Sequence, residues 1–321
     1  MIKFYTDEFS DEEKVSFIKN NLMDKYEKKG MPSYFLLQYL NGAGNELGEK
    51  YWQPHSSSRM AFDLYGWLKD NNDALDFCFE KQLDGMKSGG MGPNMDVFIE
   101  TKDEVIFIES KFTESADLRY INTKKESDSY LSPAYWTKEP YGRKKNEDGS
   151  KGYSIEERYY GYGFHQEVSE FCIEFNKMME NNPKWKDGGS WFEPKQETCH
   201  LIGILFYVFK HREELRGKTI KLLNIYWWMN GDNQDPEIKK QFCTKAMNLL
   251  EDIKEKFDLD IKFEISAFTV QKLSKENSLL SKNIHFPEGL IESVIERNES
   301  IVGNRTRRAF KRKNSIPNEE V

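Results

Sequence analysis

Apolar positions along the chain switch between helical spacing and strand spacing, and this pattern gives an element order. After Ser56, the residues Met60, Leu64 and Leu68 recur every four positions, which predicts a helix with one apolar face. Residues 74–83 alternate polar and apolar as a half-buried strand does, and two β-rich runs follow over 95–101 and 104–112. Further on, the pattern predicts a helix over 164–180, strands over 200–210 and 220–229, a helix from Pro236, and a strand over 261–265. The sequence therefore predicts an α/β fold with a mixed central sheet flanked by helices.

Composition and charge narrow the class of protein. The chain has 321 residues, with 47 Lys and Arg against 54 Asp and Glu, and a net charge of −7. The longest apolar run, Leu201–Phe209, is too short to cross a bilayer, and the acidic N-terminus lacks the apolar segment of a secretory signal. Four scattered cysteines without a C-x-x-C pair indicate neither a disulfide framework nor a zinc site. We expect a cytoplasmic protein with no membrane partner.

Three charged residues interrupt the two β-rich runs, and their mutual placement can be worked out. Lys102-Asp103 separates the runs as a hairpin turn would, so Thr101 faces Glu104. Counting back along both strands puts Asp96 opposite Glu109, and a four-residue loop closed by Glu100 and Val105 gives the same register. Residues opposite each other share one face with Cβ atoms roughly 4.5–5.5 Å apart, and Lys111, two positions after Glu109, shares that face.

Such a pair of carboxylates favours a divalent cation. Two acids at this spacing repel each other unless a cation lies between them, and Mg²⁺ takes oxygen ligands, of which one or two are usually carboxylates. Asp96, Glu109 and the main-chain carbonyl of Ser110 can supply part of that shell, and we expect Mn²⁺ to substitute for Mg²⁺. A neighbouring lysine can position water or neutralise phosphate charge, so the pattern predicts metal-assisted hydrolysis of a phosphodiester.

The segment P-N-M-D, Pro93–Asp96, followed by E-S-K, Glu109–Lys111, resembles the PD-(D/E)XK nuclease superfamily, which includes restriction endonucleases. The resemblance implies a restriction-endonuclease-like αβββαβ core and covers roughly residues 40–230. It also implies Mg²⁺-dependent cleavage of DNA, with Asp96 and Glu109 as metal ligands and Lys111 as the catalytic lysine. In this chain Pro93 is not adjacent to the aspartate, which departs from the family pattern. The stretch 45–67 is similar to one branch of the family that supplies a helix acid, for which Glu46 is the candidate, with Glu49 next.

Several polar residues are candidates for contacts with nucleic acid, each with a plainer interpretation. Ser57 and Ser58 can bind phosphate oxygens at a helix start or act only as helix caps. Arg143, Lys144 and Lys145 lie in a polar loop rich in aromatic residues, and they suit phosphate contacts, whereas most of the aromatics fit a small satellite core. Gln166 opens the helix after the third strand, where the resembling family often places a polar residue near the active site. A solvent-facing glutamine fits that position equally well.

The sequence thus predicts a single nuclease-like domain over 1–300, with a helical N-terminal part and an insertion near 115–163, and a basic C-terminal tail over 301–321. The tail suits either a phosphate contact or solvent. The expected function is a Mg²⁺-dependent DNA endonuclease, and cutting both strands would favour a homodimer. Two alternatives stay open. One is a non-catalytic nucleic-acid-binding or interaction module on the same scaffold, and the other is a structure-specific or RNA nuclease.

Overall fold

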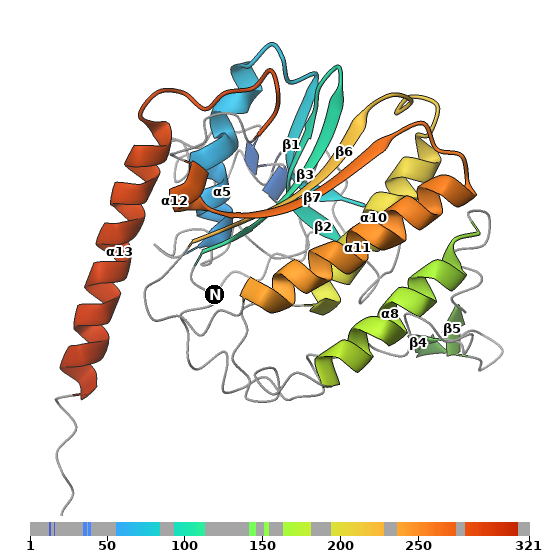
Figure 1. Cartoon of the computed structure of the whole chain (residues 1–321). Coiled ribbons are helices and arrows are strands. Elements are labelled where there is room, and N and C mark those ends of the chain that lie inside the picture. Colours follow the sequence, from blue (N-terminus) through green and yellow to red (C-terminus); the bar gives the residue numbers. More distant parts are fainter. Residues whose placement is uncertain are drawn as a thin grey trace, which may run out of the picture.

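The computed structural model describes residues 56–83, 93–112, 163–180, 194–227, 236–273 and 280–313, the backbone of 141–145 and 151–153, and six residues before position 40 (Figure 1). Its centre is a five-stranded mixed sheet in the order β1-β2-β3-β6-β7. The strands are β1 (Asp76–Gln82), β2 (Asn94–Glu100), β3 (Glu104–Lys111), β6 (Thr219–Tyr226) and β7 (Lys262–Thr269). β1, β2 and β3 are antiparallel neighbours, whereas β3, β6 and β7 run parallel. The predicted α/β class with a mixed sheet is confirmed.

Helices cover both faces of this sheet and enclose two cores. One face carries α8 (His165–Glu180), α10 (Pro194–Lys210) and α11 (Pro236–Lys256), which pack on Phe98, Val105 and Phe107 (Figure 1). The other carries α5 (Ser57–Tyr65) with the short helix η1 (Gly66–Asp70), α12 (Val270–Leu273) and α13 (Leu290–Lys313). Because β3 is buried on both faces, its side chains from Val105 to Ile108 are apolar on both sides, and the buried Glu109 and Ser110 that follow them are therefore unusual.

The hairpin register predicted from the sequence is confirmed. Val97 pairs with Ile108 and Glu100 with Val105, as the count from a Lys102-Asp103 turn requires. At the turn, the Thr101 N–H donates to the Glu104 carbonyl at 2.8 Å, and the Glu104 N–H donates to Thr101 Oγ1 at 2.9 Å. The hydrogen bond to the threonine side chain therefore stabilises a hairpin turn that lacks the glycine usually found in two-residue turns.

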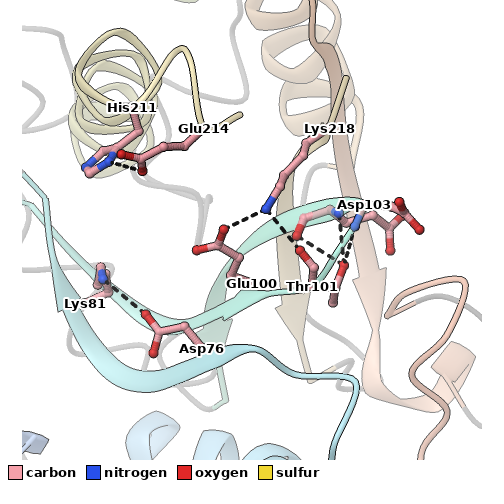
Figure 2. Close-up of polar contacts among 9 residues, drawn as sticks. Asp76, Lys81, Glu100, Thr101, Asp103, His211, Glu214 and Lys218 are labelled. Atoms are coloured by element: carbon pink, nitrogen blue, oxygen red, sulfur yellow. Dashed lines mark hydrogen bonds and ion pairs between the residues drawn. The ribbon is translucent and has the colours of Figure 1, made fainter. Parts of the chain in front are cut away.

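An ion pair joins this turn end of the sheet to the segment that precedes β6. Lys218 Nζ lies 2.7 Å from Glu100 Oε1 and donates to the Thr101 carbonyl at 3.2 Å (Figure 2). His211 and Glu214, just beyond the C-terminal end of α10, pair at 3.0 Å near the same end. α10 therefore runs back along the sheet, with its last turn near the hairpin turn and its first turn near the C-terminal end of β3.

One predicted strand is wrong. Residues 200–210 belong to α10, which begins at Pro194 and contributes Leu201, Ile202 and Leu205 to the core. A nine-residue apolar run reads equally well as a buried strand or as part of a buried helix, because neither shows a polar face. The start of this helix did carry a signal, since proline at the first position with glutamate in the first turn is typical of helix N-termini.

Other predicted segments are covered only in part. α13 continues through Lys313, so the basic stretch that we predicted as part of a tail is helical in its backbone up to that residue. Within the predicted insertion, β4 (Tyr141–Lys145) and β5 (Lys151–Tyr153) form a separate two-stranded sheet. The rest of that insertion and most of the N-terminal part lie outside the described residues.

Candidate active site

Polar residues line up across the sheet near the C-terminal end of β3, on strands that are otherwise largely apolar. The hairpin register places Asp96 of β2 opposite Glu109 of β3, and Glu109 pairs in turn with Asn224 of β6. On the other side, Phe79 pairs with Val97 and Lys81 with Met95, so Glu80 of β1 stands opposite Asp96. Three acidic residues therefore hold facing register positions on three adjacent strands.

Glu109 is the most buried of the three acids, with a side chain only 2% exposed. Its Oε1 accepts from Lys111 Nζ at 2.6 Å and from Gln196 Nε2 at 2.8 Å. Its Oε2 has no hydrogen-bond partner within the described part of the chain, and His200 Nδ1, also buried and without such a partner, lies 3.8 Å away. An ionised carboxylate oxygen left without a donor in the interior is costly, which indicates that a further group completes this site.

Asp96 is held by the backbone of the neighbouring strand. Its Oδ2 accepts from the Ser110 N–H at 2.6 Å. Burial, and then the negative charges of Glu109 and Glu80, raise the pKa of Asp96 well above its usual value, whereas Lys111 and the Ser110 N–H act in the opposite direction but do not outweigh them. The excess of negative charge at this point is what a bound cation would relieve.

A tyrosine approaches Asp96 from the other face of the sheet. Tyr65, at the end of α5, is fully buried, and its hydroxyl has no hydrogen-bond partner among the described residues. Burial and the charge of Asp96 raise the pKa of Tyr65, so the phenol stays protonated and remains a donor. A buried phenol normally finds an acceptor, so this hydroxyl can donate to a ligand or a water near Asp96.

The first turn of α10 lines the site from the opposite side. Besides Gln196, this end of the helix supplies Glu197 in the first turn and His200 in the second, which are 3% and 2% exposed. With its amide nitrogen turned toward Glu197, Asn224 donates to both carboxylate oxygens at 2.8 and 3.0 Å, so this second buried acid is satisfied. The N-terminal end of a helix carries a partial positive charge, which suits a position beside Glu109.

Gly203 allows α10 to lie this close to the strands. A Cβ at this position would stand 2.8 Å from Pro93 Cγ and 3.0 Å from the Cβ of Leu83. Pro93, the proline of the P-N-M-D segment, therefore packs against α10 at the start of β2. This contact sets the distance between the strand that carries Asp96 and the helix that carries Gln196.

The other predicted site residues fall in four groups. Ser56, not Ser57 or Ser58, caps α5 by accepting from the Arg59 N–H at 3.2 Å, and Ser58 is buried. Gln166 is exposed in the first turn of α8 and donates to Glu170 at 3.0 Å. The backbone of Arg143, Lys144 and Lys145 belongs to β4, a strand rather than the predicted loop. Glu46 and Glu49 lie outside the described residues.

Sequence reasoning missed the polar residue that actually contacts Glu109. It named Gln166, on the helix after the third strand, as a candidate near the site and left a solvent-facing role equally open, and it interpreted residues 200–210 as a strand. Gln196 holds that position instead, in α10. Glu80 and Tyr65 were missed as well, since only the register and the fold bring them to Asp96.

The residues present fit a hard divalent cation better than they fit a metal such as zinc. Within the described ranges, no group of three or more His, Cys, Asp or Glu side chains is arranged to hold a metal ion. Mg²⁺ does not need such a group, since it usually keeps several waters and takes one or two carboxylates. Asp96, with its raised pKa, and Glu109, with its unpartnered Oε2, meet that lesser requirement.

Comparisons with known proteins add no assignment. A scan against protein-family models, a search of curated proteins and a search of solved structures each found no match for this chain. Among the described residues, no helix is both long and apolar enough to span a membrane.

Proposed function

We propose that this chain is a Mg²⁺-dependent endonuclease that hydrolyses phosphodiester bonds in DNA, with its active site at the C-terminal end of β3. The observation that carries the proposal is the juxtaposition of Asp96, Glu109 and Lys111 on two adjacent antiparallel strands, with Lys111 Nζ 2.6 Å from Glu109. The order of α5, β1 to β3, α10 and β6 agrees with the αβββαβ core of the PD-(D/E)XK superfamily, which the motif resembles.

Each residue has a distinct part in this proposal. Asp96, Glu109 and the Ser110 carbonyl would hold the cation. When bound, Mg²⁺ supplies Lewis-acid polarisation of a phosphoryl oxygen and neutralises developing charge. The Ser110 N–H fixes Asp96, and Gln196 fixes Glu109, so both carboxylates are oriented before a ligand arrives.

Lys111 would act on the attacking water and on the phosphate. In the structure its ammonium group donates to Glu109, and its side chain is 22% exposed, so it reaches from the buried acid toward solvent. From there it can orient the attacking water, accept or donate a proton at Nζ, and stabilise negative charge on the phosphate.

The test is plasmid cleavage with purified full-length chain in Mg²⁺ and in EDTA. Wild type is expected to nick or linearise plasmid only with the metal, and Asp96→Asn, Glu109→Gln and Lys111→Met are each expected to lose at least about a hundredfold in rate. Glu213→Gln is the matched control, because Glu213 is an exposed carboxylate in the turn after α10. Equal cleavage by wild type and all three site variants would reject the proposal.

One observation favours a second candidate function, a non-catalytic module that binds nucleic acid. The 2.6 Å pair between Lys111 and Glu109 already gives the buried acid one cation, as a purely structural ion pair would. A non-catalytic module on this scaffold would bind nucleic acid equally well in EDTA and in Mg²⁺, and its melting temperature would not respond to Mg²⁺ or Mn²⁺. These two measurements separate it from the nuclease.

A further inference from the structure

The last helix, α13, has two halves of different chemistry. The first half, residues 290–301, packs on α5 and α12, and its Ile291 and Val294 are buried in the core on that face of the sheet. The second half, residues 302–313, carries six of the chain's 47 Lys and Arg and none of its 54 Asp and Glu. The second half therefore has a charge of +6 in a chain whose net charge is −7.

One stripe of positions runs the whole length of α13. Steps of three and four residues, which keep positions on one side of a helix, connect Ile291, Val294, Asn298, Ile301, Arg305, Arg308 and Arg312. In the first half, the side chains of this stripe are buried or partly buried against the rest of the protein. In the second half, every position of the stripe is an arginine. The side of the helix that packs on the protein therefore continues as a row of arginine positions.

The second half of α13 extends from the end of the sheet that holds the candidate active site. α12 begins directly after Thr269, which pairs with Tyr226, and Tyr226 pairs with Lys111. α12 therefore stands at the level where β3 ends. α13 packs on α12 and on α5, and Figure 1 shows its second half continuing past both helices and past the ends of the strands. The row of arginine positions thus continues beyond the edge of the sheet at which Lys111 lies.

Two plainer explanations do not account for this charge. Cations favour the C-terminal end of a helix, but that effect falls off within the last turn, and three of the six basic residues stand more than one turn before the helix ends at Lys313. A membrane surface requires an apolar face beside the basic one, and residues 303–313 contain two apolar residues, Ala309 and Phe310. A helical segment this basic and this poor in apolar residues suits the phosphates of a nucleic acid.

We infer that the second half of α13 is a DNA-binding arm, in which Arg305, Arg308 and Arg312 contact phosphates of the duplex that flanks the active site. The inference rests on the proposed function, which supplies the duplex. The arm is about 18 Å long, and double-stranded DNA carries one charge per about 1.7 Å of its axis, so the arm can run alongside about ten phosphates. Because phosphate contacts carry no sequence information, the arm positions the duplex and leaves the choice of sequence to other residues.

The test measures the salt dependence of DNA binding without cleavage. Fluorescence anisotropy of a labelled duplex of about 30 base pairs is recorded in EDTA, between about 50 and 200 mM KCl, for the full-length wild type and for Arg308→Ala/Arg312→Ala. Each lost phosphate contact lowers the slope of log Kd against log salt by about 0.9, so the double variant should lose about 1.8 from the slope. It should also bind at least about tenfold more weakly at about 100 mM salt. Alanine favours helix, so the backbone of the arm is retained.

Two control variants remove the same amount of charge elsewhere. Arg307→Ala/Lys311→Ala takes two cations from outside the stripe on the same helix. Arg212→Ala/Arg216→Ala takes two exposed arginines from the turn after α10, at the opposite end of the sheet. Each control is expected to change the slope by less than about 0.5, which is roughly half of one phosphate contact.

The outcomes separate the arm from the nuclease. An unchanged slope for Arg308→Ala/Arg312→Ala, an equal loss in either control, or a wild type that does not bind the duplex would overturn the arm. Plasmid cleavage in Mg²⁺ by the same wild-type protein tests the proposed function independently. Cleavage by wild type together with an unchanged slope in the variant would reject the arm alone. A reduced slope in the variant, with no cleavage by wild type, would support the arm and reject the nuclease.

Discussion

Replacing Lys111 by methionine should make the protein less stable without metal and make its metal binding tighter. The substitution removes the cation that lies 2.6 Å from Glu109 and leaves a carboxylate that is 2% exposed with one donor, Gln196. Breaking a fully buried ion pair costs about 3–5 kcal/mol. Because the Lys111 side chain is 22% exposed and water can reach it, we expect a lower cost of about 2 kcal/mol.

This cost should depend on the metal. Lys111 and a divalent cation both neutralise Glu109, so they compete, and the variant should gain more from Mg²⁺ than wild type does. By reciprocity, the amount by which Mg²⁺ reduces the cost of the substitution equals the amount by which the substitution strengthens Mg²⁺ binding. Recovering about 1.4 kcal/mol corresponds to tenfold tighter binding.

The assay is urea unfolding of wild type and Lys111→Met, each in EDTA and in saturating Mg²⁺. Lys254→Met is the control, because it removes a lysine from an i,i+3 surface pair with Glu251, whose side chains are 31% and 42% exposed, and should cost less than about 0.5 kcal/mol in either buffer. Competition between Lys111 and the cation is refuted if the cost of Lys111→Met is the same with and without Mg²⁺, or if the variant binds Mg²⁺ more weakly than wild type.

Three further predictions concern the framework of the site. Lys221→Met should lower the free energy of unfolding by about 3–5 kcal/mol, measured in urea, because Lys221 lies 2.6 Å from Glu104, which is 3% exposed. Burial acts to raise the pKa of Glu104, but hydrogen bonds from Lys221 and Ser281 outweigh it and lower the pKa. The ionised Glu104 therefore stabilises the fold above its unfolded pKa of about 4.3, and this contribution is lost as the pH falls through its folded pKa. The loss in free energy of unfolding caused by Glu104→Gln, relative to wild type, should therefore shrink between pH 6 and pH 3. Gly203→Ala should cost about 1–3 kcal/mol through its clash with Pro93, partly offset by about 1 kcal/mol of helix propensity, and circular dichroism melting should show a lower midpoint.

The central hairpin was predictable because its signals are local. A two-residue polar turn between two apolar runs fixes the register, and the register brings Asp96 opposite Glu109. Charged residues inside strands that are apolar on both faces then stand out without further knowledge of the fold. The sheet's mixed character followed from the order of elements along the chain.

The rest of the site depends on contacts between segments far apart in the sequence. Gln196 reaches Glu109 across 87 positions, and its helix was interpreted as a strand because an apolar run has no polar face to reveal its period. Glu80 looks like an ordinary polar position in an alternating strand, and nothing local announces its left-handed backbone. Tyr65 follows an amphipathic helix pattern that predicts burial, not the missing partner of its hydroxyl.

The most direct test of the metal site is a crystal of the full chain grown or soaked in Mn²⁺ and measured for anomalous scattering. We predict an anomalous peak in contact with the carboxylates of both Asp96 and Glu109, and its disappearance in Glu109→Gln. Well-ordered Asp96 and Glu109 side chains with no peak between them, at a Mn²⁺ concentration that supports cleavage, would contradict it.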